Sequence, residues 1–115
     1  MQKGKVYEDK AARFLELKGY KILCRNWRAR YGEIDVIARD GAYTVFLEVK
    51  ARARNCNVSG LEALSAAKRH RIVKTALLYT AGAPDASYRF DVLEIIHGKD
   101  CLEYNLIKDA FRMNE

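Results

Sequence analysis

The sequence is poor in cysteine and has no cysteine pair at the spacing that metal sites and redox motifs use. Its 115 residues include three cysteines, Cys24, Cys56 and Cys101. An odd number of cysteines, with no pair of histidines nearby, favours neither a disulfide framework nor a zinc site. The reducing cytoplasm is therefore the expected compartment.

Long apolar runs, internal repeats and low-complexity segments are also missing. Uninterrupted apolar stretches such as residues 45–47 and 76–79 are far shorter than the roughly 20 residues of a membrane span. Glu8, Asp9 and Lys10 stand where a secretion signal would need an apolar region. We expect a soluble protein with no membrane partner.

The composition that remains is that of one globular domain. Apolar residues make up 50% of the chain and charged residues 31%, a balance that argues against disorder. A chain of this length can bury roughly two-thirds of the surface that its unfolded form exposes. Residues 1–115 are therefore expected to form a single domain with its own core.

The positive charge is concentrated in one stretch. The net charge is +6, and residues 49–81 carry seven cations and one anion, whereas the rest of the chain carries 14 of each. A localised positive field favours polyanionic partners, nucleic acid first and a membrane surface second. The alternative is a solvated helix face without a partner.

Hydrophobic periodicity and turn signals predict an αβββαββ order, a single α/β domain with a mixed sheet. The expected elements are a helix over residues 5–18, strands over 20–27, 33–39 and 43–52, a helix over 61–80, strands over 88–96 and 101–106, and a helical turn near 110–111. The helix start rests on the capping-box form of residues 59–62.

The second and third strands form a hairpin that gathers acidic side chains. A two-residue turn at residues 40–41 would place Glu33 opposite Glu48 and Asp35 opposite Phe46. Alternation then predicts one apolar face, made of Ile34, Val36, Ala38, Val45, Leu47 and Val49. The opposite face collects Glu33, Asp35, Glu48, Lys50 and Arg52.

Three carboxylates on one sheet face repel one another, and something must compensate them. Lys50 supplies one positive charge, and a bound Mg²⁺ or Mn²⁺ ion would suit the hard oxygen ligands of Asp35 and Glu48. The alternative is an open sheet face in water, on which acidic and basic residues alternate without a ligand.

Both helices add candidate residues. Glu8 lies at the margin of the apolar stripe of residues 5–18, where it can reach the sheet or remain a solvated acid of the first turn. Lys68 lies within the inward stripe of the second helix, where a lysine either snorkels or meets an anion. Residues 25–31 alternate arginines with Trp27 and Tyr31, which fits phosphate contacts and base stacking as well as an aromatic core residue flanked by solvated arginines.

Two motifs make the chain resemble a known family. These are Gly-Glu-Ile-Asp-Val-Ile-Ala at residues 32–38 and Val-Phe-Leu-Glu-Val-Lys-Ala-Arg at residues 45–52. With Arg25-Asn26, Lys68 with Arg71, and Arg-Phe-Asp-Val at residues 89–92, they resemble the bacterial YraN family of uncharacterised proteins over nearly the whole chain. That family is similar to the restriction-endonuclease-like superfamily and, in plan, to archaeal Holliday-junction resolvases.

The resemblance implies a restriction-endonuclease-like αβββαβ core with a mixed sheet flanked by helices. It also implies a Mg²⁺- or Mn²⁺-dependent nuclease acting on DNA rather than RNA, with branched structures among the candidate substrates. Asp35, Glu48, Lys50 and Glu8 match the catalytic motif, and Asp35, Glu48 and Glu8 match its metal ligands. Glu33 is expected to act outside the first ligand set.

Five basic residues are expected to contact nucleic acid: Arg25, Arg28, Arg52, Lys68 and Arg71. A resolvase-like activity would require a homodimer, because two strands must be cut in concert. The competing hypotheses are a nucleic-acid-binding module that keeps the nuclease fold without turnover, and an interaction protein whose acidic site is vestigial.

Overall fold

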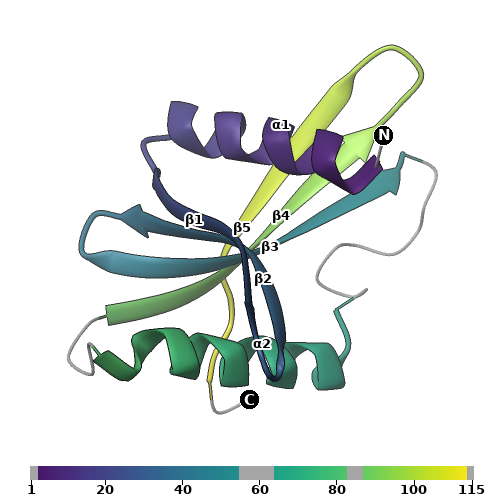
Figure 1. The fold of residues 1–115 in the computed structure, drawn as a ribbon. Coiled ribbons are helices and arrows are strands. Elements are labelled where there is room, and N and C mark those ends of the chain that lie inside the picture. Colours follow the sequence, from purple (N-terminus) through teal and green to yellow (C-terminus); the bar gives the residue numbers. More distant parts are fainter. Residues whose placement is uncertain (1–2, 55–63, 83–86, 114–115) are drawn as a thin grey trace.

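The computed structural model describes residues 3–54, 64–82 and 87–113 (Figure 1). In chain order the elements are α1 (Lys3–Leu17), β1 (Lys21–Ala29), β2 (Gly32–Asp40), β3 (Tyr43–Ala53), α2 (Ala66–Tyr79), a short 3-10 turn η1 (Thr80–Gly82), β4 (Ser87–His97) and β5 (Leu102–Phe111). No helix among these residues combines the length and the apolar character needed to cross a membrane.

The five strands form one mixed sheet in the order β1-β2-β3-β4-β5. β3 and β4 pair in parallel, and the other neighbours pair antiparallel. A parallel pair needs a crossover connection, and α2 lies within it. Figure 1 shows α1 on one face of the sheet and α2 on the other. The expected mixed α/β fold, with an αβββαβ core flanked by helices, is confirmed.

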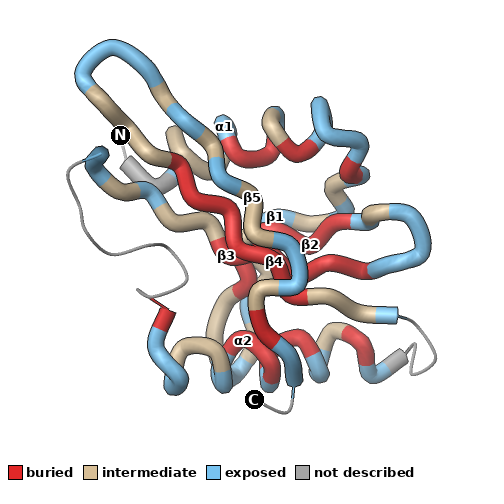
Figure 2. The backbone as a smooth tube through the Cα atoms, turned by 180° about the vertical axis from the view of Figure 1, so that it is seen from behind, coloured by how far each residue is buried: buried red, intermediate tan, exposed pale blue. Residues whose placement is uncertain are grey.

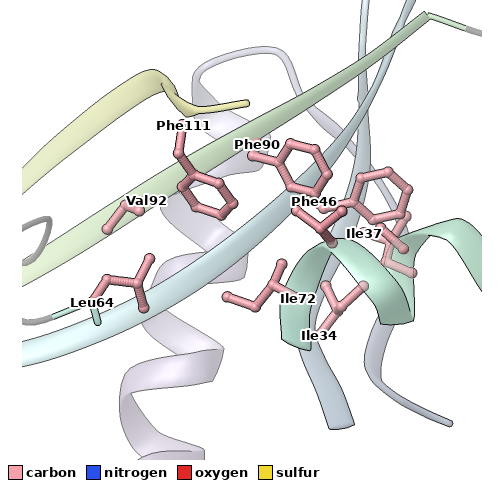
Figure 3. Packing of buried hydrophobic residues seen from close by; sticks show 10 residues of the cluster. Ile34, Ile37, Phe46, Leu64, Ile72, Phe90, Val92 and Phe111 are labelled. Carbon is pink, nitrogen blue, oxygen red and sulfur yellow. The ribbon is translucent and has the colours of Figure 1, made fainter. Parts of the chain in front are cut away.

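Each face of the sheet has its own hydrophobic cluster. Val36, Ala38, Val45 and Leu47 pack with Ala11 and Leu15 of α1. Ile37, Phe46 and Phe90 pack with Ile72 and Ala76 of α2, as Figure 3 shows for most of this cluster. The most deeply buried residues therefore lie mainly on the central strands (Figure 2).

The β2–β3 register differs from the predicted one. Asp40 pairs with Tyr43, so residues 41–42 form the turn, and Gly41 supplies the positive φ of 60°. This shift of two residues means that Asp35 does not pair with Phe46, whose partner is Ile37. The shift is even, so most side chains keep their predicted face.

One residue of the predicted apolar face was assigned wrongly. The ladder between β2 and β3 is regular from Asp40 back to Val36, which pairs with Leu47. Beyond that point Ile34 packs in the α2-side cluster, whereas Val36 packs on the α1 side. The alternation of faces is therefore interrupted between these two residues, and Asp35 lies at the interruption.

The start of the second helix was also predicted wrongly. Residues 55–63, including the sequence on which the capping box was based, lie outside the described residues. Ser65 is extended, with φ −62° and ψ 160°, and its side chain accepts a hydrogen bond from the backbone amide of Lys68. Ser65 is therefore the N-cap, and the helix begins at Ala66.

The end of the chain is a strand rather than a helical turn. β5 extends to Phe111, which pairs with Phe90. A register shift between Phe90 and Val92, together with the positive φ of 53° at Asp109, interrupts the alternation that the sequence pattern relied on. The amide of Asp109 donates a hydrogen bond of 3.0 Å to Asp91 Oδ1, which holds this irregular segment on β4.

Candidate functional site

A cavity of about 280 Å³ opens between α1, the central strands and the start of α2. Its lining residues are Tyr7, Glu8, Asp35, Glu48, Val49, Lys50, Ala51 and Lys68. All four sequence-predicted catalytic residues are among them, from α1, β2 and β3, and α2 adds Lys68. Residues up to 61 positions apart in the sequence thus share one cavity.

Asp35 is the acid whose electrostatics the fold alters most. Its Oδ2 accepts a hydrogen bond of 2.8 Å from the backbone amide of Val49. Burial and then the negative charge of Glu48 raise the pKa of Asp35 to about 8, although the Val49 hydrogen bond opposes this rise. At neutral pH the isolated protein therefore keeps a proton on Asp35.

Glu48 is almost completely buried and is compensated by two lysines. Its Oε2 lies 3.1 Å from Lys68 Nζ and 3.7 Å from Lys50 Nζ. The sequence indicated Lys50 as the compensating cation, and the structure adds the closer one from α2. Of the two roles considered for Lys68, contact with an anion is the observed one.

A second acidic grouping overlaps the cavity. One carboxylate oxygen each from Glu8, Glu33 and Asp35 lie within 4.8 Å of one another. Glu33 was expected to act outside the first ligand set. It nevertheless meets the same 4.8 Å limit to Asp35 as Glu8 does. Arg28 Nε donates a hydrogen bond of 3.2 Å to Glu33 Oε2 and partly compensates its charge.

Asn26 is a site neighbour to which sequence reasoning assigned no role. Its side-chain amide donates a hydrogen bond of 3.1 Å to Glu8 Oε1, and its backbone has a positive φ of 54°. Asparagine tolerates this conformation better than most residues. Its place in the Arg25-Asn26 motif was the one signal available, and it did not reveal the partner.

The donor chemistry of this site fits a hard divalent cation. The cavity and its acidic neighbours present carboxylate oxygens and no imidazole or thiolate among the described residues, which suits Mg²⁺ or Mn²⁺. A divalent cation would also offset the repulsion that raises the pKa of Asp35.

The five predicted nucleic-acid-binding residues do not form one group. Arg25 NH2 lies 2.6 Å from Asp9, and Arg52 Nε lies 2.7 Å from the buried Glu94. Lys68 belongs to the cavity. Arg28, whose side chain is 78% exposed, and the exposed Arg71 face solvent.

These features define an α/β protein with a restriction-endonuclease-like core and an acidic cavity flanked by lysines. The chain belongs to the uncharacterised protein family UPF0102, whose model matches residues 7–95. This membership confirms the resemblance to the YraN family.

The chain aligns over most of its length with other members of this family. A UPF0102 protein of Symbiobacterium thermophilum is 46% identical over 94% of this chain and 94% of its own length. A UPF0102 protein of Sulfurihydrogenibium sp. is 46% identical over 82% of this chain and 84% of its own length. A third, from Dechloromonas aromatica, is 43% identical over 98% and 91%.

Proposed function

We propose that this protein is a metal-dependent nuclease that hydrolyses phosphodiester bonds of DNA. The observation that carries this proposal is the meeting of Glu8, Asp35, Glu48 and Lys50 in one cavity, at the electrostatic cost seen at Asp35. Burying one carboxyl group next to another is unfavourable unless a bound ligand compensates their charge. Groups with perturbed pKa values cluster at functional sites.

Asp35 and Glu48 would hold the cation, with Glu8 as a further ligand and Glu33 beside them. A bound Mg²⁺ or Mn²⁺ ion supplies Lewis-acid polarisation of the phosphodiester and lowers the pKa of water. The hydrogen bond from Val49 to Asp35 orients that carboxylate toward the cavity rather than toward solvent. Asp35 must release its proton to act as a ligand.

The two lysines have distinguishable roles in this proposal. Lys68 is the closer partner of Glu48 and holds that carboxylate in place from α2. Lys50, at 3.7 Å and lining the same cavity, is the cation that contacts the phosphate and stabilises the charge that develops on its oxygens.

The distribution of charge supports a polyanionic substrate. α2 carries Lys68, Arg69, Arg71 and Lys74 and has no acidic residue. The acidic cavity lies at the first turn of this helix, where the cations can offset the repulsion between a phosphate backbone and the carboxylates.

The test is a cleavage assay on labelled junction, flap, duplex and single-stranded DNA, and on single-stranded RNA, with Mg²⁺ or Mn²⁺. Glu48→Gln and Lys50→Met are expected to abolish cleavage. Glu103→Gln and Lys10→Met, matched changes at exposed positions outside the cavity, should cleave as the wild type does.

Two other results would change the conclusion. Salt-sensitive binding without cleavage, unchanged in both cavity variants, would favour a binding module that keeps the nuclease fold. Symmetric cutting of a junction requires two copies of the site, so a monomeric mass by light scattering under cleavage conditions would rule out the homodimer that a resolvase needs.

A further inference from the structure

The β1–β2 hairpin rests its tip on α2. A side-chain carbon added at Gly32 would lie 3.6 Å from Thr75 Oγ1 and 4.0 Å from Arg71 Cβ. Figure 1 shows the same arrangement, with the tip of the dark-blue hairpin reaching the helix on the far side of the sheet from α1. Residues 30 and 31 therefore share a surface with the middle of α2.

An exposed aromatic ring flanked by cations lies where the hairpin tip meets α2. Tyr31 is 38% exposed, and its ring centroid lies 5.1 Å from Arg30 Cζ and 5.3 Å from Lys74 Nζ. We call Arg30, Tyr31, Arg71 and Lys74 the tip–helix platform. Within the described part of the chain, no ion pair joins an acid to its three cations.

Trp27, the other aromatic residue of this segment, is partly buried against the core. It packs edge-on against Tyr79, with the ring centroids 5.3 Å apart at 88°, and belongs to the rim of the α2-side cluster. Of the two roles considered for residues 25–31, core packing therefore applies to Trp27 and an exposed surface role remains for Tyr31.

The tip–helix platform continues from the acidic cavity. Lys68, Arg71 and Lys74 follow one another at three-residue spacing, which makes each a neighbour of the next on the surface of α2. Lys74 is about 9 Å farther along the helix axis than Lys68, because each residue adds about 1.5 Å.

We propose that the tip–helix platform binds unpaired nucleotides adjacent to the bond that is cut, with Tyr31 stacking on a base and the cations contacting phosphates. This inference rests on the proposed nuclease function and narrows its substrates to nucleic acids with a single-stranded segment beside the cleavage site. Inside a duplex each base stacks on its neighbours and presents no free ring face, whereas an unpaired base does.

The test is fluorescence anisotropy with a labelled single strand, the same sequence as a duplex, and that duplex carrying a flap. The measurements are made in EDTA, in which metal-dependent cleavage is absent. Tyr31→Ala is expected to weaken binding of the single strand and of the flap about 5- to 160-fold, since one stacked base contributes that much. Duplex binding should change less than twofold, and Tyr31→Phe should bind as the wild type does.

Tyr43→Ala is the matched control. Tyr43 is 44% exposed, lies at the β2–β3 turn and has the Arg89 guanidinium 5.3 Å from its ring centroid. Its loss should leave all affinities unchanged. Lys74→Ala should weaken binding of every substrate and lower the slope of log affinity against log salt by about 0.7–0.9. Melting temperatures verify that each variant is folded.

The proposal is overturned if Tyr31→Ala and Tyr43→Ala have equal affinities for the single strand, or if Tyr31→Ala weakens duplex and single-strand binding alike. Parallel arms with DNA and RNA strands identify the sugar. Tyr31-dependent binding without cleavage would refute the nuclease and keep the platform. Cleavage that depends on Glu48 but not on Tyr31 would keep the nuclease and refute the platform. Neither binding nor cleavage of any strand would refute both.

Discussion

Lys68 Nζ lies 3.1 Å from Glu48 Oε2, so a lysine of α2 is a closer partner of this buried acid than Lys50, two residues along the same strand at 3.7 Å. Glu48 is 5% exposed. The contact joins the first turn of α2 to the middle of β3 and places two cations on one carboxylate oxygen.

Removal of the Lys68 amine is expected to destabilise the protein. Lys68→Met leaves Glu48 buried with Lys50 as its remaining cation, and an undercompensated buried group costs about 1–3 kcal/mol. Lys74→Met, on the same helix but exposed, should cost about 0.5 kcal/mol. Urea denaturation of both variants measures the difference, and equal midpoints would show that the Lys68–Glu48 contact does not stabilise the fold.

Stability without metal should depend on pH through Asp35. Its pKa rises from an ordinary value of 3.8 to about 8 on folding, so between these values the folded protein binds a proton that the unfolded chain has lost. The wild type in EDTA therefore loses stability as the pH rises from about 4 to about 8. Asp35→Asn should remove this component and melt at a higher temperature than the wild type at pH 8.

Asp9→Asn is the control for this experiment. A hydrogen bond from Arg25 lowers the pKa of Asp9, which is exposed, so removing its charge should not raise the melting temperature at pH 8. A melting temperature of Asp35→Asn below that of the wild type at pH 8 in EDTA would contradict the assigned repulsion.

Mn²⁺ is expected to bind the isolated protein and to release a proton. At pH 7 Asp35 is mostly protonated because its pKa is about 8, so binding should release about one proton per ion. Isothermal titration calorimetry in buffers of different ionisation enthalpy measures this number. Heats that do not depend on the buffer would exclude Asp35 as the group that loses the proton.

The acids around Asp35 should contribute to this affinity. Glu8→Gln and Glu33→Gln each remove a carboxylate whose oxygen lies within 4.8 Å of Asp35, and each should weaken Mn²⁺ binding about tenfold or more. Glu103→Gln, on the exposed side of β5 and paired with Arg54, should bind as the wild type does. Unchanged affinity in Glu33→Gln would return Glu33 to a role outside the ligand set.

A separate buried network is expected to carry stability rather than function. Arg89 donates to Asp91 and to Asp40 at 2.8–2.9 Å, and Asp91 is 1% exposed. Arg89→Met should cost about 3–5 kcal/mol because it leaves a buried carboxylate without its cation. Arg54→Met removes an exposed, solvent-screened ion pair and should cost far less than Arg89→Met does. Equal losses of unfolding free energy in the two variants would mean that burial of the ion pair does not determine its contribution to stability.

The order of elements and the main cavity residues were predictable from the sequence. Periodicity is a local property, so α1 and the central strands were predicted within a few residues of their observed bounds. Glu48 and Lys50 share a face because strand side chains alternate. Glu8 was predicted from its place at the margin of an apolar stripe, and it lies in the cavity.

Errors arose where several local patterns fit equally well. A turn at residues 40–41 and one at 41–42 both contain Gly41, and the observed pairing of Asp40 with Tyr43 shows that the chain uses the second. The predicted helix start rested on residues 59–62 alone, and the N-cap is Ser65, which is extended and accepts a hydrogen bond from the Lys68 amide. The sequence pattern ended the last strand at residue 106, whereas β5 continues to Phe111 through the irregular backbone at Asp109.

The sequence by itself determined which chemical groups are present, the faces that they occupy and the excess of positive charge in residues 49–81. Only the tertiary structure decided that Lys68 neutralises Glu48, that Asp35 accepts the amide of Val49, and that Tyr31 rather than Trp27 faces solvent. Such contacts join segments brought together by packing of the whole chain, and no local pattern encodes the distance between them.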